Sequence, residues 1–321
     1  MSQTRDEDQS ELAVSVQGLW KSYGGEPAVR GIDLSIRRGE IFALLGPNGA
    51  GKTTTIEILE GYRRRDRGTI AVLGLDPALE RTRLKSRIGI VLQATGVDRY
   101  LTVAETITMF ARYYPHPRPT DEVIELVGLT EKHEERVLKL SGGQLRRLDV
   151  AIALVGDPEL LFLDEPTTGF DPSARRGAWE VVRNLAGLGK TVLLTTHYMD
   201  EAQYLADEVA IISGGQIVAI GPPSTLGGRN SARPLLRFPI PEAFSPPAQL
   251  GGHRITNGLW EIQPDDLAVA LRDLSNWAIA DRISLDELEI VRPTLEDVYL
   301  ELTGSTDLAI PEQLDPRIGR R

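Results

Sequence analysis

One segment near the beginning of the chain constrains the fold more than any other. Residues 40–45, EIFALL, are almost continuously apolar, as is typical of a strand buried on both faces of a parallel sheet. A glycine-rich loop follows at residues 46–53, and Ile56, Leu59 and Tyr62 then share one helical face. The sequence therefore predicts a strand, a loop and a helix in direct succession.

The loop matches G-x-x-x-x-G-K-[ST], in the strand-to-helix context in which this pattern binds phosphate. Its glycines allow backbone N–H groups to close around a β-phosphate, and the helix N-terminus adds partial positive charge. Lys52 is expected to reach the β- and γ-phosphates, and the Thr53 hydroxyl is expected to bind Mg²⁺. The predicted nucleotide-binding residues of the loop are Gly46, Pro47, Asn48, Gly49, Ala50, Gly51, Lys52, Thr53 and Thr54.

A second apolar run, at residues 160–163, ends in two acids, Asp164 and Glu165. Ligands of parallel sheets bind at the carboxyl ends of the strands, so these acids are expected beside the phosphate loop. Asp164 would hold Mg²⁺ through water, and Glu165 would polarise or deprotonate the water that attacks the γ-phosphate. Taken alone, this pair has an alternative interpretation, in which the two residues are exposed acids in a turn at the end of a strand and have no catalytic role.

Strands and helices alternate along most of the chain, which predicts an α/β fold with mostly parallel strands. Strands are predicted at residues 12–19, 32–36, 40–45, 88–92, 160–163, 191–195 and 208–212. Helices are predicted at residues 102–112, 120–127, 142–155, 172–188 and 199–206, in addition to the helix that follows the phosphate loop.

Composition excludes several classes of protein. The 321 residues contain no cysteine, which excludes thiol catalysis, cysteine-ligated metal centres and disulfides. A formal net charge of −10 argues against general electrostatic binding of nucleic acid. The N-terminus has no apolar signal segment, and the longest apolar runs are too short for a membrane span, so any membrane role is expected to need a separate partner.

Leu140-Ser141-Gly142-Gly143-Gln144 forms a second glycine-containing turn at the start of a helix, a geometry that also suits an anion. With this LSGGQ signature and the two nucleotide motifs in order, the chain resembles the nucleotide-binding subunit of an ABC transporter over residues 12–226. The resemblance implies an ATPase with a helical subdomain that drives a separate permease. It also implies a head-to-tail homodimer, in which Ser141, Gly142, Gly143 and Gln144 close on the ATP of the other subunit.

Four further residues stand at positions that the resemblance assigns to the site. Tyr23 would stack on adenine, Gln93 would lie near Mg²⁺ and the attacking water, His197 would be the switch histidine, and Asp171 the D-loop aspartate. The implied catalytic residues are thus Glu165, His197 and Gln93, and the implied Mg²⁺ ligands are Thr53, Gln93 and Asp164.

The composition changes after residues 221–223, where proline and small residues mark a boundary. We expect flexible tails at residues 1–11 and 305–321, a nucleotide-binding domain at 12–228 and a small α+β accessory domain at 229–304. In the last of these, a strand at 235–238, a hairpin turning at 257–258, a helix at 265–277, a strand at 283–291 and a final helix are predicted. Thr294 and Asp297 would cap that helix.

The segment PTLEDVYL in the final helix resembles the end of the daunorubicin-resistance type of drug-export ATPase. The alternative for this segment is a capped amphipathic helix that packs on its own domain. This resemblance implies export of a drug, antibiotic or lipid-like compound, with the chain held at the cytoplasmic face of the membrane by its permease. Residues 94–107 would contact the permease, or they form an ordinary loop and helix. The run Arg63-Arg64-Arg65-Asp66-Arg67 is either a solvated face or a contact with phospholipid headgroups.

Two other functional classes are alternatives to a transporter subunit. A soluble ABC-type ATPase acting on ribosomes or nucleic acid would use the same chemistry, but such proteins usually carry two cassettes or a long coiled coil before the signature. This chain has one cassette, and only residues 55–139 separate the phosphate loop from the signature. A non-hydrolysing subunit is disfavoured because both Glu165 and His197 are present.

Overall fold

The computed structural model describes residues 11–91, 96–228, 234–240, 244, 246–247, 250–255, 259–291 and 294–303. Apart from Glu11, the expected terminal tails lie outside these residues. The chain divides into two compact units. Residues up to Pro223, together with those from Leu302 on, form the first, and Ser224–Glu301 form the second.

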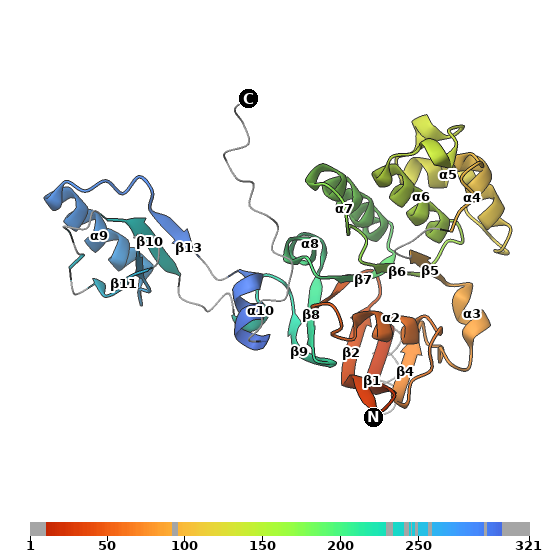
Figure 1. The fold of residues 1–321 in the computed structure, drawn as a ribbon, viewed down its shortest axis with the longest axis horizontal. Helices are drawn as coiled ribbons and strands as arrows, with labels where there is room; N and C mark the ends of the chain where they lie inside the picture. Colours follow the sequence, from red (N-terminus) through yellow and green to blue (C-terminus); the bar gives the residue numbers. More distant parts are fainter. Residues whose placement is uncertain are drawn as a thin grey trace. The chain divides into compact units, whose positions relative to one another are not determined.

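A six-stranded sheet forms the centre of the first unit (Figure 1). Its strands are parallel except for the last, which pairs antiparallel with its neighbour. In spatial order they are β5 (Ile88–Val91), β6 (Leu160–Asp164), β7 (Thr191–Thr196), β3 (Ile41–Leu45), β8 (Glu208–Ser213) and β9 (Gln216–Gly221). Every residue of β3 and β7 is buried, as the continuous apolar runs predicted.

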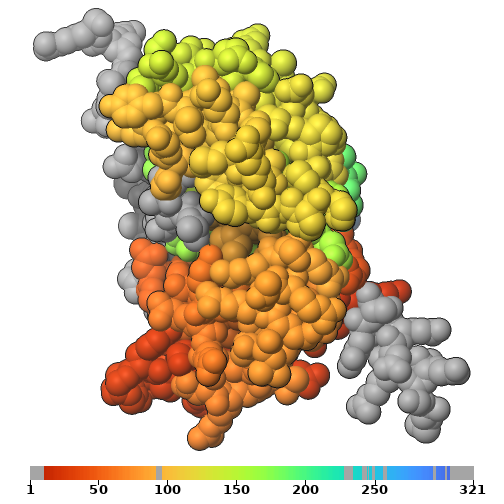
Figure 2. All heavy atoms as spheres, turned by 90° about the vertical axis from the view of Figure 1, so that its right-hand side faces the viewer, coloured from red at the N-terminus to blue at the C-terminus, as the bar shows by residue number. Residues whose placement is uncertain are grey.

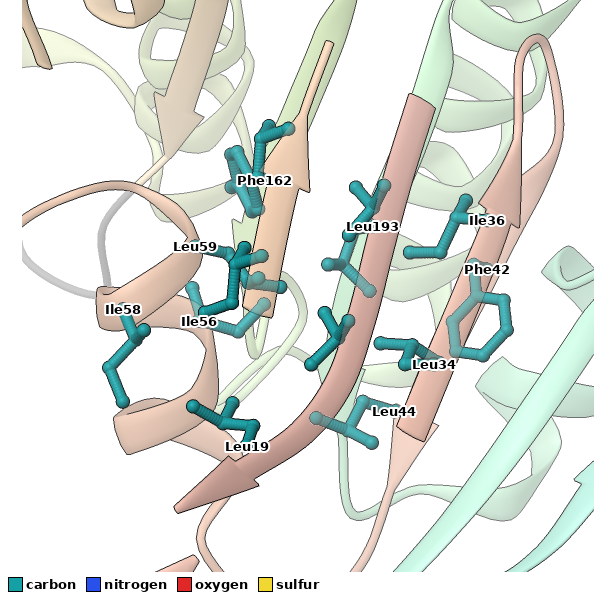
Figure 3. Close-up of a cluster of buried hydrophobic side chains, with 14 of the residues drawn as sticks. Leu19, Leu34, Ile36, Phe42, Leu44, Ile56, Ile58, Leu59, Phe162 and Leu193 are labelled. Carbon is teal, nitrogen blue, oxygen red and sulfur yellow. The ribbon is translucent and has the colours of Figure 1, made fainter. Parts of the chain in front are cut away.

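A second, antiparallel sheet is formed by β2 (Glu26–Arg37), β1 (Leu12–Tyr23) and β4 (Arg67–Val72). Its inner side chains share one hydrophobic cluster with the central sheet and with helix α2 (Lys52–Leu59). Figure 3 shows this cluster, with Phe42 and Leu44 of β3 among the side chains of β2 and α2. Strands β4 (Arg67–Val72) and β9 were not predicted from the sequence, although the residues of β9 alternate in burial.

Helices α4 (Val103–Ala111), α5 (Thr120–Leu126) and α6 (Gly142–Leu154) pack on one another as a helical group. On the face drawn in Figure 2 this group (yellow) and the part that carries α2 and β4 (orange) appear as two lobes with a furrow between them. Short segments complete the unit, namely α3 (Arg81–Lys85), η1 (Thr130–Lys132) and η2 (Val137–Lys139).

Helices α7 (Pro172–Gly187) and α8 (Met199–Leu205) complete the α/β alternation of the first unit. In Figure 1, α6 and α7 lie on one side of the central strands, and α2 with the antiparallel sheet lies on the other. The sheet is therefore covered on both faces, as its buried parallel strands require.

The second unit contains a four-stranded antiparallel sheet in the order β11 (His253–Arg254), β12 (Leu259–Ile262), β10 (Leu235–Pro239) and β13 (Glu289–Val291). Helix α9 (Leu267–Asp281) packs on this sheet through Ala270 and Leu274, which meet Leu236 and Phe238 in one apolar cluster. The predicted hairpin turn at residues 257–258 lies outside the described residues.

The predicted strand at residues 283–291 is wrong over most of its length, because only Glu289–Val291 form a strand. Helix α9 continues to Asp281, and Arg282 then takes a left-handed conformation with φ 54° that ends it. The Ser284 hydroxyl accepts a hydrogen bond from the Asp286 backbone N–H at 3.1 Å, which favours a turn over a strand.

The unit also contains η3 (Leu226–Gly228) and all but the last two residues of the final helix α10 (Leu295–Thr303). The predicted cap of α10 is confirmed. The Asp297 N–H donates to the Thr294 hydroxyl at 3.2 Å, and the Asp297 carboxylate accepts from the Thr294 N–H at 2.6 Å. This reciprocal pair satisfies donors that the first helical turn would otherwise leave open.

Candidate active site

The phosphate loop connects the carboxyl end of β3 to the first turn of α2. A Cβ atom at Gly46 would lie 2.4 Å from the carbonyl oxygen of Ile212, and one at Gly51 would lie 2.5 Å from that of Ala28. Gly51 also has φ 105°, a conformation that side chains strain. The first and last glycines of the motif are therefore fixed by close packing against the neighbouring backbone.

Lys52 is folded over this loop. Its ammonium donates to the carbonyl oxygens of Gly46 at 2.7 Å and Pro47 at 3.1 Å, and the side chain is almost completely buried. The same nitrogen lies 3.5 Å from Oε1 of Glu165. Burial lowers the pKa of Lys52, and the negative charges of Glu165 and Asp164 oppose that effect. A cation is thus held where the motif predicts phosphate.

Glu165 faces Lys52 from the end of β6. Its Oε1 lies 3.2 Å from Nδ1 of His197, and its Oε2 accepts a hydrogen bond from the Thr168 hydroxyl at 3.1 Å. These contacts lower the pKa of Glu165 to about 2, with the His197 imidazole as the largest cause and burial acting in the opposite direction. The structure thus brings together three residues that the sequence analysis placed in the site.

Thr195, which the sequence analysis did not single out, fixes the backbone at this point. Glu165 has φ 45°, and its N–H donates to both the carbonyl and the hydroxyl oxygen of Thr195, at 3.2 and 3.0 Å. The Thr195 hydroxyl in turn donates to Oδ1 of Asp164. The only signal in the sequence was a polar residue ending an apolar run two positions before His197.

Arg146 is a second residue that sequence reasoning missed. It lies on α6 and is buried, and its guanidinium donates to the carbonyl oxygens of Pro166 at 3.0 Å and Asp164 at 3.3 Å. These carbonyls flank Glu165. Asp149, three residues later on the same helix, is also buried and lies 3.7 Å from the guanidinium. Two opposite charges at this spacing within a largely apolar helix were a usable signal, because a buried charge needs partners.

The signature residues begin α6 through a capping box. Ser141 accepts from the Gln144 N–H at 3.3 Å, and the Gln144 side chain accepts from the Ser141 N–H at 2.9 Å. Asp171 caps α7 in a similar way, accepting from the N–H groups of Ser173 and Ala174. Both helix starts line one cavity of about 480 Å³.

The residues that line this cavity come from the signature and D-loop segments, and no phosphate-loop residue is among them. Within one chain the two nucleotide motifs therefore form separate surfaces. Tyr23 ends β1 and is 41% exposed, and Thr53 is exposed on the first turn of α2. Gln93 lies outside the described residues.

Comparison with known proteins decides the family. A family model described as ABC transporter matches residues 29–168. The Nod factor export ATP-binding protein I of Sinorhizobium fredii is 38% identical over 310 residues, covering 92% of this chain and 87% of that protein. The daunorubicin resistance ATP-binding protein of Streptomyces coeruleorubidus is 35% identical over 326 residues, covering 92% and 97%. The chain belongs to the ABC transporter ATP-binding proteins.

This ATP-binding protein also shares its fold with a solved ATP-binding cassette, described as a dimeric post-hydrolysis state bound to ADP and phosphate. The TM-score is 0.58 at 23% identity, over 65% of this chain and 98% of that chain. The ABC-cassette fold and the family predicted from the motifs are confirmed. As a member of this family, the protein is an ATPase subunit whose hydrolysis of ATP drives transport.

Subunits of this family dimerise and pair with permeases. Within the residues that the structure describes, no helix is both long enough and apolar enough to cross a membrane. The alternative of a soluble ATPase acting on ribosomes or nucleic acid is not favoured, because the two relatives above are named for export and for drug resistance.

Proposed function

We propose that this ATP-binding protein powers the export of a drug, antibiotic or lipid-like compound through a separate permease, at the cytoplasmic face of the membrane. The names of its relatives support the substrate class. The observation that carries the hydrolytic role is the cluster of Glu165, His197 and Lys52 at the strand ends beside the phosphate loop.

ATP would bind across the phosphate loop, with its base on the Tyr23 ring. The backbone N–H groups of residues 46–54 would surround the β-phosphate. Lys52 would exchange its carbonyl partners, Gly46 and Pro47, for phosphate oxygens, which are stronger acceptors because they are charged. Binding of ATP thereby separates Lys52 from Glu165.

Mg²⁺ fits the donors at this edge of the sheet. It takes oxygen ligands and usually keeps one or two protein ligands beside phosphates and waters. The exposed hydroxyl of Thr53 and the partly exposed carboxylate of Asp164 are such donors, and we assign them to the ion together with Gln93. When bound, Mg²⁺ would neutralise charge on the phosphates.

Glu165 would orient the attacking water. A carboxylate with a pKa of about 2 is ionised throughout the physiological range and is a weak base. It therefore polarises the water and takes its proton only as charge develops in the transition state. His197 holds this carboxylate in place and would contact the γ-phosphate from the other side.

A homodimer would complete each ATP site. The cavity of about 480 Å³ between the signature turn and the Asp171 segment presents helix N-termini, which attract anions. We assign this cavity, with Ser141, Gly142, Gly143 and Gln144, to the γ-phosphate held by the phosphate loop of the second subunit. Closure would then depend on ATP and reopening on loss of phosphate.

The permease would be contacted through residues 94–107, of which the structure describes 96–107, including the start of α4. Tyr100 in this segment is 74% exposed. Purifying the tagged full chain from its own cells in mild detergent tests the pairing. A polytopic membrane protein that co-purifies in near-equal amount is expected, and recovery with ribosomes or nucleic acid alone would contradict the transport assignment.

The assignment of Glu165 is tested with Glu165→Gln, which keeps the side-chain shape and removes the charge. We expect ATP hydrolysis to be abolished and an ATP-bound dimer to accumulate, which size-exclusion chromatography with ATP would show. Glu180→Gln, at an exposed position of α7, is the matched control and should hydrolyse ATP like the wild type. Undiminished hydrolysis by Glu165→Gln would refute the assignment.

A further inference from the structure

The basic run at residues 63–67 is neither a uniform solvated face nor a free basic surface. Arg65 forms an ion pair with Asp76 at 2.7 Å, and Asp66 forms one with Lys21 at 2.8 Å. Arg63 pairs with Glu57 on α2. For Arg64, the described part of the chain provides neither an ion pair nor a hydrogen bond. The run is thus built into the fold next to the end of β1.

Two of the cations in these ion pairs lie against the ring of Tyr23. The guanidinium carbon of Arg63 lies 5.4 Å from the centroid of the Tyr23 ring, and the ammonium of Lys21 lies 5.5 Å from it. Both are within the range of about 6 Å in which a cation is attracted to an aromatic face. The tyrosine ring is therefore held by two cations.

Each of these cations is itself anchored by a carboxylate. Lys21 is held by Asp66, and Arg63 is held by Glu57, one turn after the phosphate loop. Anchoring reduces the freedom of long side chains, so the position of the ring is defined more sharply than two mobile cations would allow. The ring is thus tied to the helix that begins at the phosphates.

Asp66 also fixes the backbone that carries the ring. Its Oδ2 accepts a hydrogen bond from the Ser22 N–H at 2.7 Å, and its own N–H donates to the Trp20 carbonyl at 2.9 Å. The residue before Tyr23 is therefore bonded to the run of residues 63–67. Backbone and ring are both held by the same four-residue segment, 63–66.

We propose that Arg63 and Asp66 are positioning residues for the nucleotide base, which act by holding Tyr23 in the orientation that stacks on a purine. The inference rests on the proposed role of Tyr23 in base stacking. Because stacking uses the face of the base and not its edge, the positioning does not depend on which base the nucleotide carries. The triphosphate is bound elsewhere, so its contacts do not depend on this segment.

This separation makes a sharp experiment possible. ATP and inorganic tripolyphosphate are compared, the latter as a competitive inhibitor that lacks a base. In Arg63→Ala we expect the KM for ATP to rise about twofold to fivefold, the range that loss of one exposed cation–aromatic contact gives. The value of kcat and the inhibition by tripolyphosphate should remain at wild-type levels.

Asp66→Ala should show the same pattern, and Arg64→Ala is the matched control that should behave like the wild type. Arg63→Gln, which loses the charge but remains polar, serves if the alanine variant folds poorly. A change in inhibition by tripolyphosphate would show a general distortion of the site and overturn the inference. So would a lower KM in Arg63→Ala, because the guanidinium would then occupy the place of the base.

Tyr23→Ala distinguishes the two levels of the proposal. If it raises the KM for ATP while Arg63→Ala and Asp66→Ala do not, the stacking role stands and the positioning role is refuted. If Tyr23→Ala leaves the KM unchanged, the stacking role itself fails, and the inference fails with it. The double variant Tyr23→Ala/Arg63→Ala should be no weaker in ATP binding than Tyr23→Ala alone.

Discussion

Replacing Glu201 with leucine should cost this protein about 2–4 kcal/mol of folding stability, and replacing it with glutamine should cost much less. Glu201 lies on α8 and is completely buried. Its Oε1 accepts hydrogen bonds from the Thr167 hydroxyl at 2.8 Å and from the Trp179 indole N–H at 3.0 Å. One carboxylate oxygen thus joins α8 to α7 and to the segment that follows Glu165.

The magnitude follows from the two donors. Leucine leaves both buried and unsatisfied, at about 1–3 kcal/mol each. Part of this cost is offset, because leucine removes a carboxylate that was expensive to bury. Glutamine keeps a carbonyl oxygen where Oε1 lies, so both hydrogen bonds can persist. The difference between the two variants therefore isolates the hydrogen bonds from the volume of the side chain.

The effect should also depend on pH with a definite sign. Burial raises the pKa of Glu201 above its ordinary 4.5, and the nearby Asp200 adds to this, while hydrogen bonds from Thr196, Thr167 and Trp179 oppose it. The folded state then holds the proton more tightly than the unfolded state, so this group favours folding below about pH 4.5 and loses that benefit as the pH rises. Glutamine does not titrate. The free energy of unfolding of Glu201→Gln, relative to that of the wild type, should therefore increase from pH 5 to pH 8.

Urea unfolding followed by tryptophan fluorescence at the two pH values measures both effects. Glu180→Leu, next to Trp179 but exposed, is the control and should change stability by less than about 0.5 kcal/mol. A leucine variant within about 0.5 kcal/mol of the wild type, or a glutamine variant whose relative stability is the same at both pH values, would refute the reasoning.

Two other predictions concern the site. The folded-state pKa of Glu165 is about 2 against an ordinary 4.5, so the wild type should lose stability as the pH falls through this window. His197→Ala removes the main cause of the lowered pKa, so this variant should lose less folding stability than the wild type between pH 5 and pH 3. Urea unfolding at the two pH values measures the losses, and equal losses in both proteins would contradict the prediction. Gly46→Ala should lower the melting temperature more than Gly187→Ala, because the added Cβ at Gly46 meets a backbone carbonyl at 2.4 Å, whereas Gly187, at the end of α7, has open space and no positive φ. Equal shifts in differential scanning fluorimetry would disprove this.

The central sheet and the phosphate loop could be predicted because their sequence signals are local. A parallel strand buried on both faces is apolar throughout, and its functional residues follow directly at its carboxyl end, as Gly46 and Asp164 do. The acids and the loop converge because the strands are parallel. No knowledge of distant contacts was needed for this part of the site.

The residues that hold the site in place could not be predicted in the same way. Thr195 meets Glu165 from a strand 30 residues further along the chain, and Arg63, between α2 and β4, meets Tyr23 at the end of β1. A hydroxyl or a guanidinium carries no periodic signal, so only the tertiary structure reveals its partner. The missed strand β4 and the wrong strand at residues 283–288 have a related cause, since short segments are decided by neighbours and turns.

The contact of Arg146 with the carbonyls on either side of Glu165 links two parts of the molecule with different tasks. Arg146 belongs to α6, the helix that begins at the signature turn and lines the cavity assigned to the second subunit's nucleotide. In the proposed dimer, closing of that cavity would displace α6, and the hydrogen bonds of Arg146 would transmit this displacement to the backbone that carries Glu165 in the same chain. Occupancy of one ATP site would then affect the other, and turnover should rise with ATP concentration more steeply than a hyperbola.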